Sequence, residues 1–274
     1  MMHQLMICAD DYAQSEEIDS AILELIQNDR LTATSCLTLS PRWGSASQRI
    51  TTQIRDKAAI GLHLDFTQYA VSQSALSTLI MRSYLKLLDQ ENIAASIHRQ
   101  LDAFEIALNS PPDYIDGHQH VHQLPQIRET LIGILLQRYP EQTPWIRIAK
   151  PPIQDGIKAM IIRGLGSSAL TTLAKQRHIS YSKTLLGVYG FQSDPAFYQH
   201  KLNQWFAQIE GGSSKQLVVL MCHPSLKGSN TGEDAIYPAR LMEYQMLSSP
   251  ELLKLIQQYN IKLTKHIEAF TRIR

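Results

Sequence analysis

Aspartate and histidine side chains follow several short apolar runs of this sequence, in a pattern that suits metal-assisted chemistry. They are Asp10 and Asp11 after LMICA, His63 after AAIGL, Asp116 and His118 within DYIDGH, and His223 after VVLMC. Carboxylates and imidazoles without thiolates suit zinc, manganese, cobalt, nickel or magnesium, and they argue against a closed structural zinc site. A divalent ion lowers the pKa of a water that it holds from 15.7 to roughly 7. The residue types therefore indicate hydrolysis by an activated water.

The segment DYIDGHQHVHQLP is the densest part of this pattern. In an extended chain Asp116, His118, His120 and His122 would project to one side. The alternative is a polar loop that is merely rich in histidine. Taken alone, the Asp10–Asp11 pair also suits a helix N-terminus, and His63 also suits a partly buried packing position. The recurrence of such residues after separate apolar runs favours one shared site.

Strand-length and helix-length patterns alternate along the chain. Strands are predicted at Gln4–Cys8, Thr34–Leu39, Ala59–Leu64, Tyr114–Ile115, Trp145–Ile148 and Leu217–Cys222, and helices at Ser15–Asn28, Ala94–Leu108, Leu124–Tyr139, Pro195–Ile209 and Pro250–Tyr259. The segment Ile153–Lys183 has a helical stretch near Ile157–Ile162 and is not assigned further. The alternation predicts an α/β fold, a (β/α) barrel resembling a TIM barrel, with an open doubly wound sheet as the alternative. In either, the carboxyl ends of the strands share one face, where the polar residues would meet.

Composition narrows the class of protein. The chain has 274 residues, 44% of them hydrophobic, and a formal charge of +1, so we expect a single domain over residues 1–274 and no nucleic-acid partner. No apolar run approaches the roughly 18 residues of a membrane span. The N-terminal run meets Asp10 without a basic leader, and the three cysteines, Cys8, Cys36 and Cys222, lie in apolar surroundings. Reduced core cysteines and a cytoplasmic location are therefore expected, and a homodimer stays open.

Several motifs together resemble those of the YdjC-like carbohydrate deacetylases. They are ADDY from Ala9, LTATSCL from Leu31, GLHL from Gly61, DGHQHVHQLP from Asp116, VYGF at Val188–Phe191, MCHP from Met221 and SPEL near the end. Their order and spacing agree with the family over most of the chain.

The resemblance implies that the barrel is a distorted (β/α) barrel of the polysaccharide-deacetylase type, and it also implies a specific site and reaction. One divalent cation, Mg or Zn with Mn, Co or Ni as alternatives, would be held by Asp11, His63 and His118. The reaction would be hydrolysis of the acetamide of an N-acetylated sugar. By analogy with other polysaccharide deacetylases, Asp10 would be the general base and His223 the general acid. Two other classes compete with this interpretation: another barrel metallohydrolase, such as an amidohydrolase or phosphoesterase, and a sugar-binding protein without turnover.

The sequence departs from the family pattern at three places. Tyr12 and Ala13 stand where the family usually has Phe and Gly, so Ala13 would have to adopt any positive φ that this turn requires. Gly117 and Gln119 flank His118 where the family has Ser and His. The segment Asp65–Leu88 carries Ile80, Met81, Tyr84, Leu85, Leu87 and Leu88, which we expect to form a core-facing helix, although they could also alter the choice of substrate.

Overall fold

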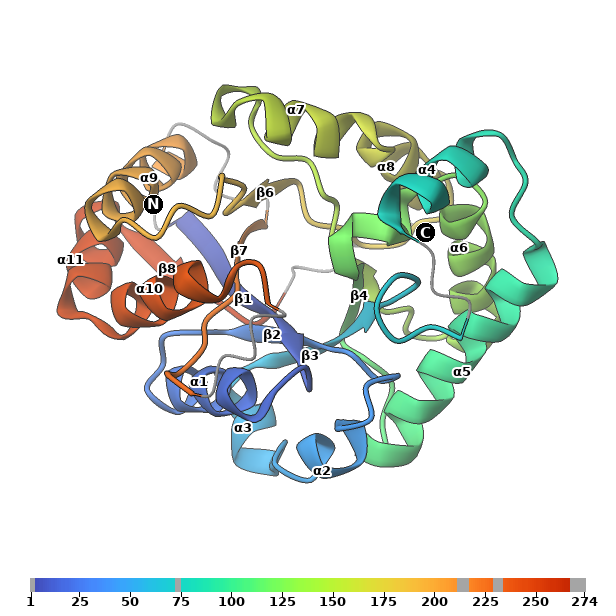
Figure 1. Ribbon diagram of the computed structural model, residues 1–274, viewed down its shortest axis with the longest axis horizontal. Coiled ribbons are helices and arrows are strands. Elements are labelled where there is room, and N and C mark those ends of the chain that lie inside the picture. The colour runs from blue at the N-terminus through green and yellow to red at the C-terminus, as the bar shows by residue number, and fades with distance from the viewer. Residues whose placement is uncertain (1–2, 72–74, 211–216, 229–233, 267–274) are drawn as a thin grey trace.

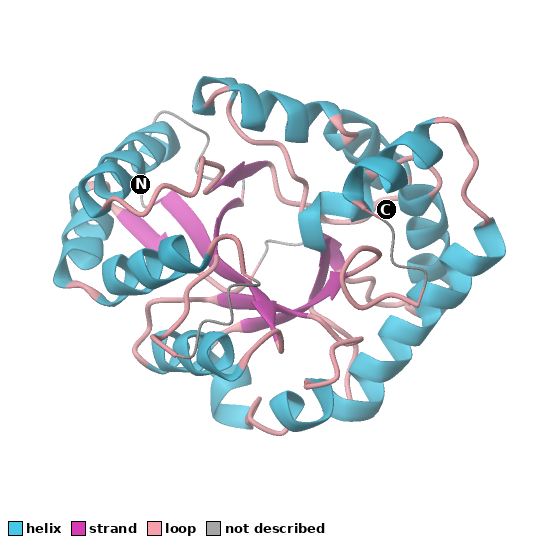
Figure 2. Cartoon of the chain, in the orientation of Figure 1, coloured by secondary structure: helices cyan, strands magenta, loops and turns pink. Residues whose placement is uncertain are grey.

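Parallel strands curve into a barrel-like sheet with helices around its outside in the computed structural model, which describes residues 3–71, 75–210, 217–228 and 234–266 (Figure 1; Figure 2). The strands are β1 (His3–Tyr12), β2 (Ala33–Cys36), β3 (Ala59–Leu64), β4 (Tyr114–Gly117), β5 (Trp145–Ile146), β6 (Thr184–Leu186), β7 (Val218–Cys222) and β8 (Ile261–Leu263).

Helices connect most of these strands. The α-helices are α1 (Glu16–Gln27), α2 (Trp43–Ser47), α3 (Thr52–Lys57), α4 (Leu76–Tyr84), α5 (Gln90–Leu108), α6 (Ile127–Arg138), α7 (Ile157–Gly164), α8 (Ser167–Gln176), α9 (Pro195–Glu210), α10 (Tyr237–Ser248) and α11 (Pro250–Gln258). Two 3₁₀ helices, η1 (His118–Gln123) and η2 (Ile153–Asp155), complete the set that the described residues form.

The sheet order is β5-β4-β3-β2-β1-β7-β6, and β8 pairs with β1. All of these pairings are parallel. The two ends of this order also meet, because Ile146 of β5 donates its N–H to the Ser180 carbonyl and accepts from the Ser182 N–H, just before β6. The predicted distorted (β/α) barrel is therefore confirmed, and the open doubly wound alternative is wrong.

Helix α1 shows how the sequence pattern produces this packing. The hydroxyl of Ser15 accepts a hydrogen bond from the Ile18 N–H and so caps the helix, and acidic residues occupy its first turn. The stripe formed by Ile18, Ile22, Leu25 and Ile26 is buried against the sheet. Burial of each such side chain contributes about 1.5 to 3 kcal/mol. The predicted helix and its buried face are both confirmed.

Most element predictions hold, and the differences have physical reasons. β1 continues past the predicted end at Cys8 to Tyr12, because ladder hydrogen bonds use the backbone and not the side chain. Helix α5 begins at Gln90, capped by Asp89, instead of at Ala94. The strands β6 and β8 were not predicted, since each spans 3 residues and is too short to show a period.

Of the apolar residues singled out in the segment Asp65–Leu88, Ile80, Met81 and Tyr84 lie in the helix α4, and Leu85, Leu87 and Leu88 follow its end. Most of these side chains do not face the core. Leu79 is buried, whereas Met81, Tyr84, Leu85 and Leu87 are exposed. The expectation of a core-facing helix is therefore wrong for these four side chains.

Two expectations from composition can be compared with the structure. Cys8, Cys36 and Cys222 are buried and free, as predicted. Among the helices that the structure describes, none has both the length and the apolar character needed to cross a membrane.

Gly61 of β3 offers a test of how tightly this barrel is packed. A Cβ at this position would lie 2.4 Å from the ring of Tyr114, which is fully buried in β4. We expect Gly61→Ala to lower the free energy of unfolding by about 1 to 3 kcal/mol in urea denaturation, because the ring has no space to move. Gly133→Ala in α6, where no atom lies within 4 Å, should instead be neutral or stabilising. Equal effects of the two substitutions would contradict this account.

Candidate active site

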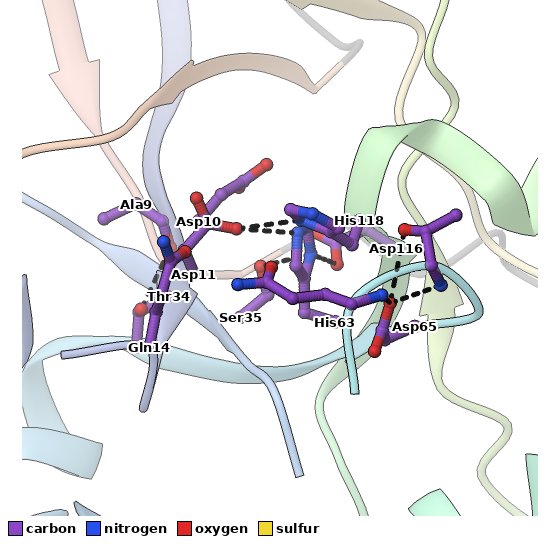
Figure 3. A network of polar contacts seen from close by, with 12 residues as sticks. Ala9, Asp10, Asp11, Gln14, Thr34, Ser35, His63, Asp65, Asp116 and His118 are labelled. Atoms are coloured by element: carbon purple, nitrogen blue, oxygen red, sulfur yellow. Dashed lines mark hydrogen bonds and ion pairs between the residues drawn. The ribbon is translucent and has the colours of Figure 1, made fainter. Parts of the chain in front are cut away.

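Asp11 of β1, His63 of β3 and His118, the first residue of η1 after β4, converge at the carboxyl end of the sheet (Figure 3). The Asp11 Oδ1 atom lies 3.4 Å from His63 Nε2 and 3.1 Å from His118 Nδ1. One candidate ligand atom from each residue lies within 4.8 Å of the others. The structure therefore brings together the three residues predicted as metal ligands.

The second ring nitrogen of His63 is held by its neighbours. His63 Nδ1 lies 2.6 Å from Asp116 Oδ1 and 3.1 Å from the Ser35 hydroxyl. Because Nδ1 is directed at Asp116, Nε2 is the ring nitrogen that faces the Asp11 carboxylate. Burial alone would lower the His63 pKa, but the charges of Asp116 and Asp10 outweigh it and raise the pKa to about 10. Two imidazoles and a carboxylate that offer one ligand atom each within 4.8 Å of one another are donors that divalent metal ions accept, so this donor set fits such an ion.

Asp10 lies beside this group but is paired with a different partner. The guanidinium of Arg147 is fully buried and places Nη1 2.5 Å from Asp10 Oδ1 and Nη2 2.7 Å from Asp10 Oδ2. Burial would raise the Asp10 pKa, but Arg147 outweighs it and holds the pKa below its usual range. Asp10 is therefore a carboxylate at neutral pH, with a fixed orientation.

Arg147 also explains a second group of potential ligands formed by Cys8, Asp10 and Asp116. Its Nη1 donates to Cys8 Sγ at 3.4 Å, and its Nη2 lies 2.9 Å from Asp116 Oδ2. The guanidinium already supplies the positive charge there, so we assign no metal to this group. The sequence analysis missed Arg147, although an arginine inside the apolar run WIRIA was a usable signal.

The backbone of β1 turns sharply where the two aspartates lie. Asp11 and Ala13 have positive φ angles of 68° and 76°, and the pairing with β2 shifts register between Ala9 and Tyr12. Successive residues of a regular strand point to opposite faces, so this irregularity is what lets both aspartates face the site. The turn does require a positive φ, and Ala13 adopts it without glycine.

Arg240 of α10 engages the other oxygen of Asp11. Its Nη2 donates to Asp11 Oδ2 at 2.8 Å, and its Nε donates to Asp234 Oδ2 at 2.6 Å. Burial would raise the pKa of Asp11, but Arg240 and the two histidines hold it well below the usual range. No feature of the sequence around Arg240 distinguished it from other helical arginines.

His223 follows β7 and faces the same cavity as the proposed metal ligands. Its backbone N–H donates to Oε2 of the buried Glu243, and Glu243 Oε1 accepts from the Tyr189 hydroxyl at 2.6 Å. The His223 ring meets Phe191 edge-on, with the ring centroids 5.3 Å apart. Burial lowers the His223 pKa to about 4, partly opposed by the charges of Asp11 and Asp10.

The histidine-rich segment does not adopt the extended conformation that we expected. β4 ends at Gly117, and a 3₁₀ helix follows in which Gln119 and His120 have positive φ. His118 therefore points to Asp11, whereas His122 donates from Nε2 to the Arg147 carbonyl at 2.7 Å. The prediction that Asp116, His118, His120 and His122 share one side is wrong because the left-handed residues break the alternation.

Asp10, Asp11, His63, His118 and His223 all line a cavity of about 1110 Å³. Polar residues at the strand ends form one part of it, and apolar residues of α4 and α7 form another. The cavity is large enough for a ligand bigger than a single sugar.

Known proteins resemble this chain in sequence and in fold. A family model described as YdjC-like protein matches residues 4–258. Chitooligosaccharide deacetylases of Yersinia pestis (strain Pestoides F) and Yersinia pseudotuberculosis serotype O:1b (strain IP 31758) are each 25% identical over 275 residues, covering 96% of this chain and 98% of theirs. The crystal structure of a candidate cellobiose-phosphate cleavage protein of Enterococcus faecalis V583 has a TM-score of 0.74 at 18% identity, covering 96% of this chain and 97% of that one. The sequence motifs, the barrel and the match over nearly the whole chain agree, and the protein belongs to the YdjC-like family.

Proposed function

We propose that this protein is a metal-dependent hydrolase that removes an acetyl group from an N-acetylated sugar. The observation that carries the proposal is that Asp11, His63 and His118 meet where the strand ends line the cavity, with Asp10 and His223 beside them. The names of the Yersinia relatives, which describe chitooligosaccharide deacetylases, support the same reaction class.

The metal would be held by Asp11 Oδ1, His63 Nε2 and His118 Nδ1. When bound, a divalent ion polarises the amide carbonyl and makes a water sufficiently acidic to attack it at neutral pH. The protein keeps His63 oriented through Asp116, and it keeps Asp11 oriented through Arg240. These contacts leave one side of the group open to the cavity.

Asp10 is the proposed general base. It is a carboxylate because Arg147 stabilises its negative charge, and the bidentate contact fixes where its oxygens lie. A base of low pKa is a weak acceptor, so its contribution depends on this orientation toward the attacking water.

His223 is the proposed general acid. The leaving amine must gain a proton, since expulsion of an amide anion is prohibitively unfavourable. With a pKa lowered to about 4, the His223 ring is neutral before the reaction. We therefore propose that the proton that Asp10 takes from the water is passed to His223, which then donates it to the leaving amine as the C–N bond breaks.

A substrate panel tests the reaction class. The metal-loaded protein should release acetate from N-acetylated mono- and oligosaccharides and should leave phosphoesters and cyclic amides intact. Cleavage of a phosphoester or cyclic amide alone would favour the other barrel metallohydrolases, and binding of sugars without turnover would favour a sugar-binding protein.

The metal assignment predicts that His118→Ala loses the ion. Loss of a group that merely orients a ligand costs about 10- to 100-fold in affinity, and loss of a ligand should cost no less. Elemental analysis after metal loading and dialysis should find about one ion per wild-type chain and markedly less in the variant. His98→Ala, which removes an exposed histidine of α5, is the matched control. Equal metal content in all three proteins would remove His118 from the ligand set.

The proposed roles predict that Asp10→Asn and His223→Ala lower kcat by about 10² to 10⁴, which is the usual contribution of one proton transfer. Both variants should retain the metal, because neither residue belongs to the proposed ligand set. Asp56→Asn, at an exposed aspartate of α3, is the control for charge loss. If His223→Ala instead lowers only the melting temperature, with kcat per folded molecule near wild type, His223 is a structural residue ahead of Pro224.

Ionisation of the buried Glu243 carboxyl should make the free energy of unfolding depend on pH. Burial raises its pKa to about 7 from 4.5, despite the hydrogen bond from His223. The folded state therefore binds the Glu243 proton more strongly than the unfolded state does. This difference adds to the free energy of unfolding at low pH, and the added free energy is lost as the pH rises from 4.5 through 7. Relative to Glu243→Gln, the wild type should lose roughly 2.5 kcal/mol of unfolding free energy between pH 5 and pH 8 in urea titrations.

The control for this titration is Glu141→Gln, at an exposed glutamate. Its stability curve should run parallel to that of the wild type over the same pH range. A Glu243→Gln curve that is also parallel to the wild type would show that Glu243 is ionised in the folded protein at all of these pH values.

A further inference from the structure

The cavity changes chemical character between its floor and one of its walls. The floor is formed by the aspartates and histidines at the strand ends. The wall is aliphatic and comes from two helices and the residue that follows the second: Leu76 and Ile80 of α4, Ile157, Ile161 and Ile162 of α7, and Leu165. A cavity with a polar floor and an aliphatic wall suits a ligand with the same two halves.

Several residues of the aliphatic wall are open to solvent. The exposed fractions are 78% for Ile157 and 58% for Ile161, and Met160 beside them is 54% exposed. Isolated exposed apolar residues are common, but these residues are contiguous with a cavity that reaches the proposed active site. Exposed apolar side chains lower the solubility of a protein, so binding of a ligand in the cavity is the simplest explanation for their exposure.

The two helices that carry the wall are held together at their carboxyl ends. The hydroxyl of Tyr84 at the end of α4 donates to the Gly164 carbonyl at the end of α7, at 3.3 Å. At the other end of α7, Lys158 Nζ donates to the Tyr189 carbonyl and lies 3.8 Å from the centre of the Phe191 ring. Figure 1 shows α4 and α7 on the same part of the barrel's outside, with α8 labelled between them. The wall is therefore attached to the site and is not a separate surface.

The side chains of this wall suit an alkyl chain better than a sugar ring. Sugar hydroxyls need hydrogen-bonding groups, and none of these aliphatic side chains has one. Phe191 is the aromatic hydrocarbon ring among the described lining residues, and it lies beside His223 instead of on the α4 and α7 wall. Apolar burial is non-directional and scales with the area removed from water, so a row of isoleucines binds methylenes.

We propose that the substrate is an amphiphile, an N-acylated amino sugar that carries an alkyl chain. The sugar amide lies at the Asp11, His63 and His118 group, and the chain lies along the wall formed by α4 and α7. The chain is attached either at the anomeric oxygen or as the acyl group itself. This inference rests on the proposed deacetylase function for the position of the sugar. The volume of about 1110 Å³ exceeds the upper end of about 1,000 Å³ typical of small-ligand sites, and so accommodates both parts.

Binding measurements with matched ligands test the chain subsite. Calorimetry compares the methyl and octyl glycosides of N-acetylglucosamine, and N-acetyl- with N-octanoylglucosamine, all below the concentrations at which they aggregate. A fully buried methylene strengthens binding about fourfold and a half-buried one about twofold, so the longer chain should lower Kd by about 100-fold. A gain in the glycoside pair places the chain on the anomeric oxygen, and a gain in the acyl pair places it on the amide. No gain in either pair would overturn the inference.

A double variant and its control test whether the increase in affinity with chain length comes from the aliphatic wall. The double substitution Ile157→Ser with Ile161→Ser should reduce the ratio of methyl to octyl Kd by about tenfold. Ile106→Ser is the matched control, because Ile106 is 84% exposed on α5 and does not line the cavity. An equal change in both variants would indicate general detergent binding and would overturn the inference. Loss of a dimer in the double variant, with the chain-length ratio unchanged, would show instead that a second copy covers this surface.

Hydrolysis measured on the same ligands separates this inference from the proposed function. A lower Kd for the longer chain without acetate or octanoate release would support the chain subsite and contradict the deacetylase. Acetate release at equal kcat/KM from the methyl and octyl glycosides, together with equal binding, would support the deacetylase and overturn the chain subsite.

Discussion

The arrangement of the site depends on one buried cation, the guanidinium of Arg147. It pairs with Asp10 of β1 and lies 2.9 Å from Asp116 of β4, and both carboxylates are buried. An isolated buried carboxylate would take up a proton instead of staying charged, so the guanidinium keeps both ionised. Asp116 in turn accepts from His63 Nδ1, which leaves Nε2 facing Asp11. One arginine therefore sets the charge of the proposed base and the orientation of a proposed ligand.

The neighbouring aspartates have different environments even though they are adjacent in sequence. The register shift and the positive φ of Asp11 separate their side chains, so that Asp10 meets Arg147 and Asp11 meets Arg240 and the histidines. A left-handed non-glycine residue costs of order 1 to 3 kcal/mol, and such strain persists where surrounding contacts determine it. Here the surrounding contacts are the ion pairs of Asp10 with Arg147 and of Asp11 with Arg240. The strained backbone therefore gives the two residues the different partners on which their proposed roles depend.

The sequence predicted the site residues that directly follow a strand, but it did not predict contacts between residues far apart in the chain. Asp10, Asp11, His63 and His223 were predicted to meet because parallel strands end at one face. Arg147 and Arg240 contact residues 137 and 229 positions away, and no local pattern encodes such pairings. The histidine-rich segment was predicted to be extended because alternation was the only signal in it. The two left-handed residues Gln119 and His120 are not glycines, so nothing in the sequence marked the bend.

The division between floor and wall follows from how this barrel is built. His63 lies within β3 and is fixed by the ladder hydrogen bonds of the sheet. His223 directly follows β7, and its N–H donates to Glu243. Neither residue can move far without disturbing these contacts. Helices α4 and α7 belong instead to the connections after β3 and β5, and each contributes few buried side chains, such as Leu79 in α4 and Ala159 in α7. Substitutions on their exposed faces therefore cost little stability. In such a fold the reaction and the choice of substrate are carried by different elements, so a shared site does not require a shared substrate.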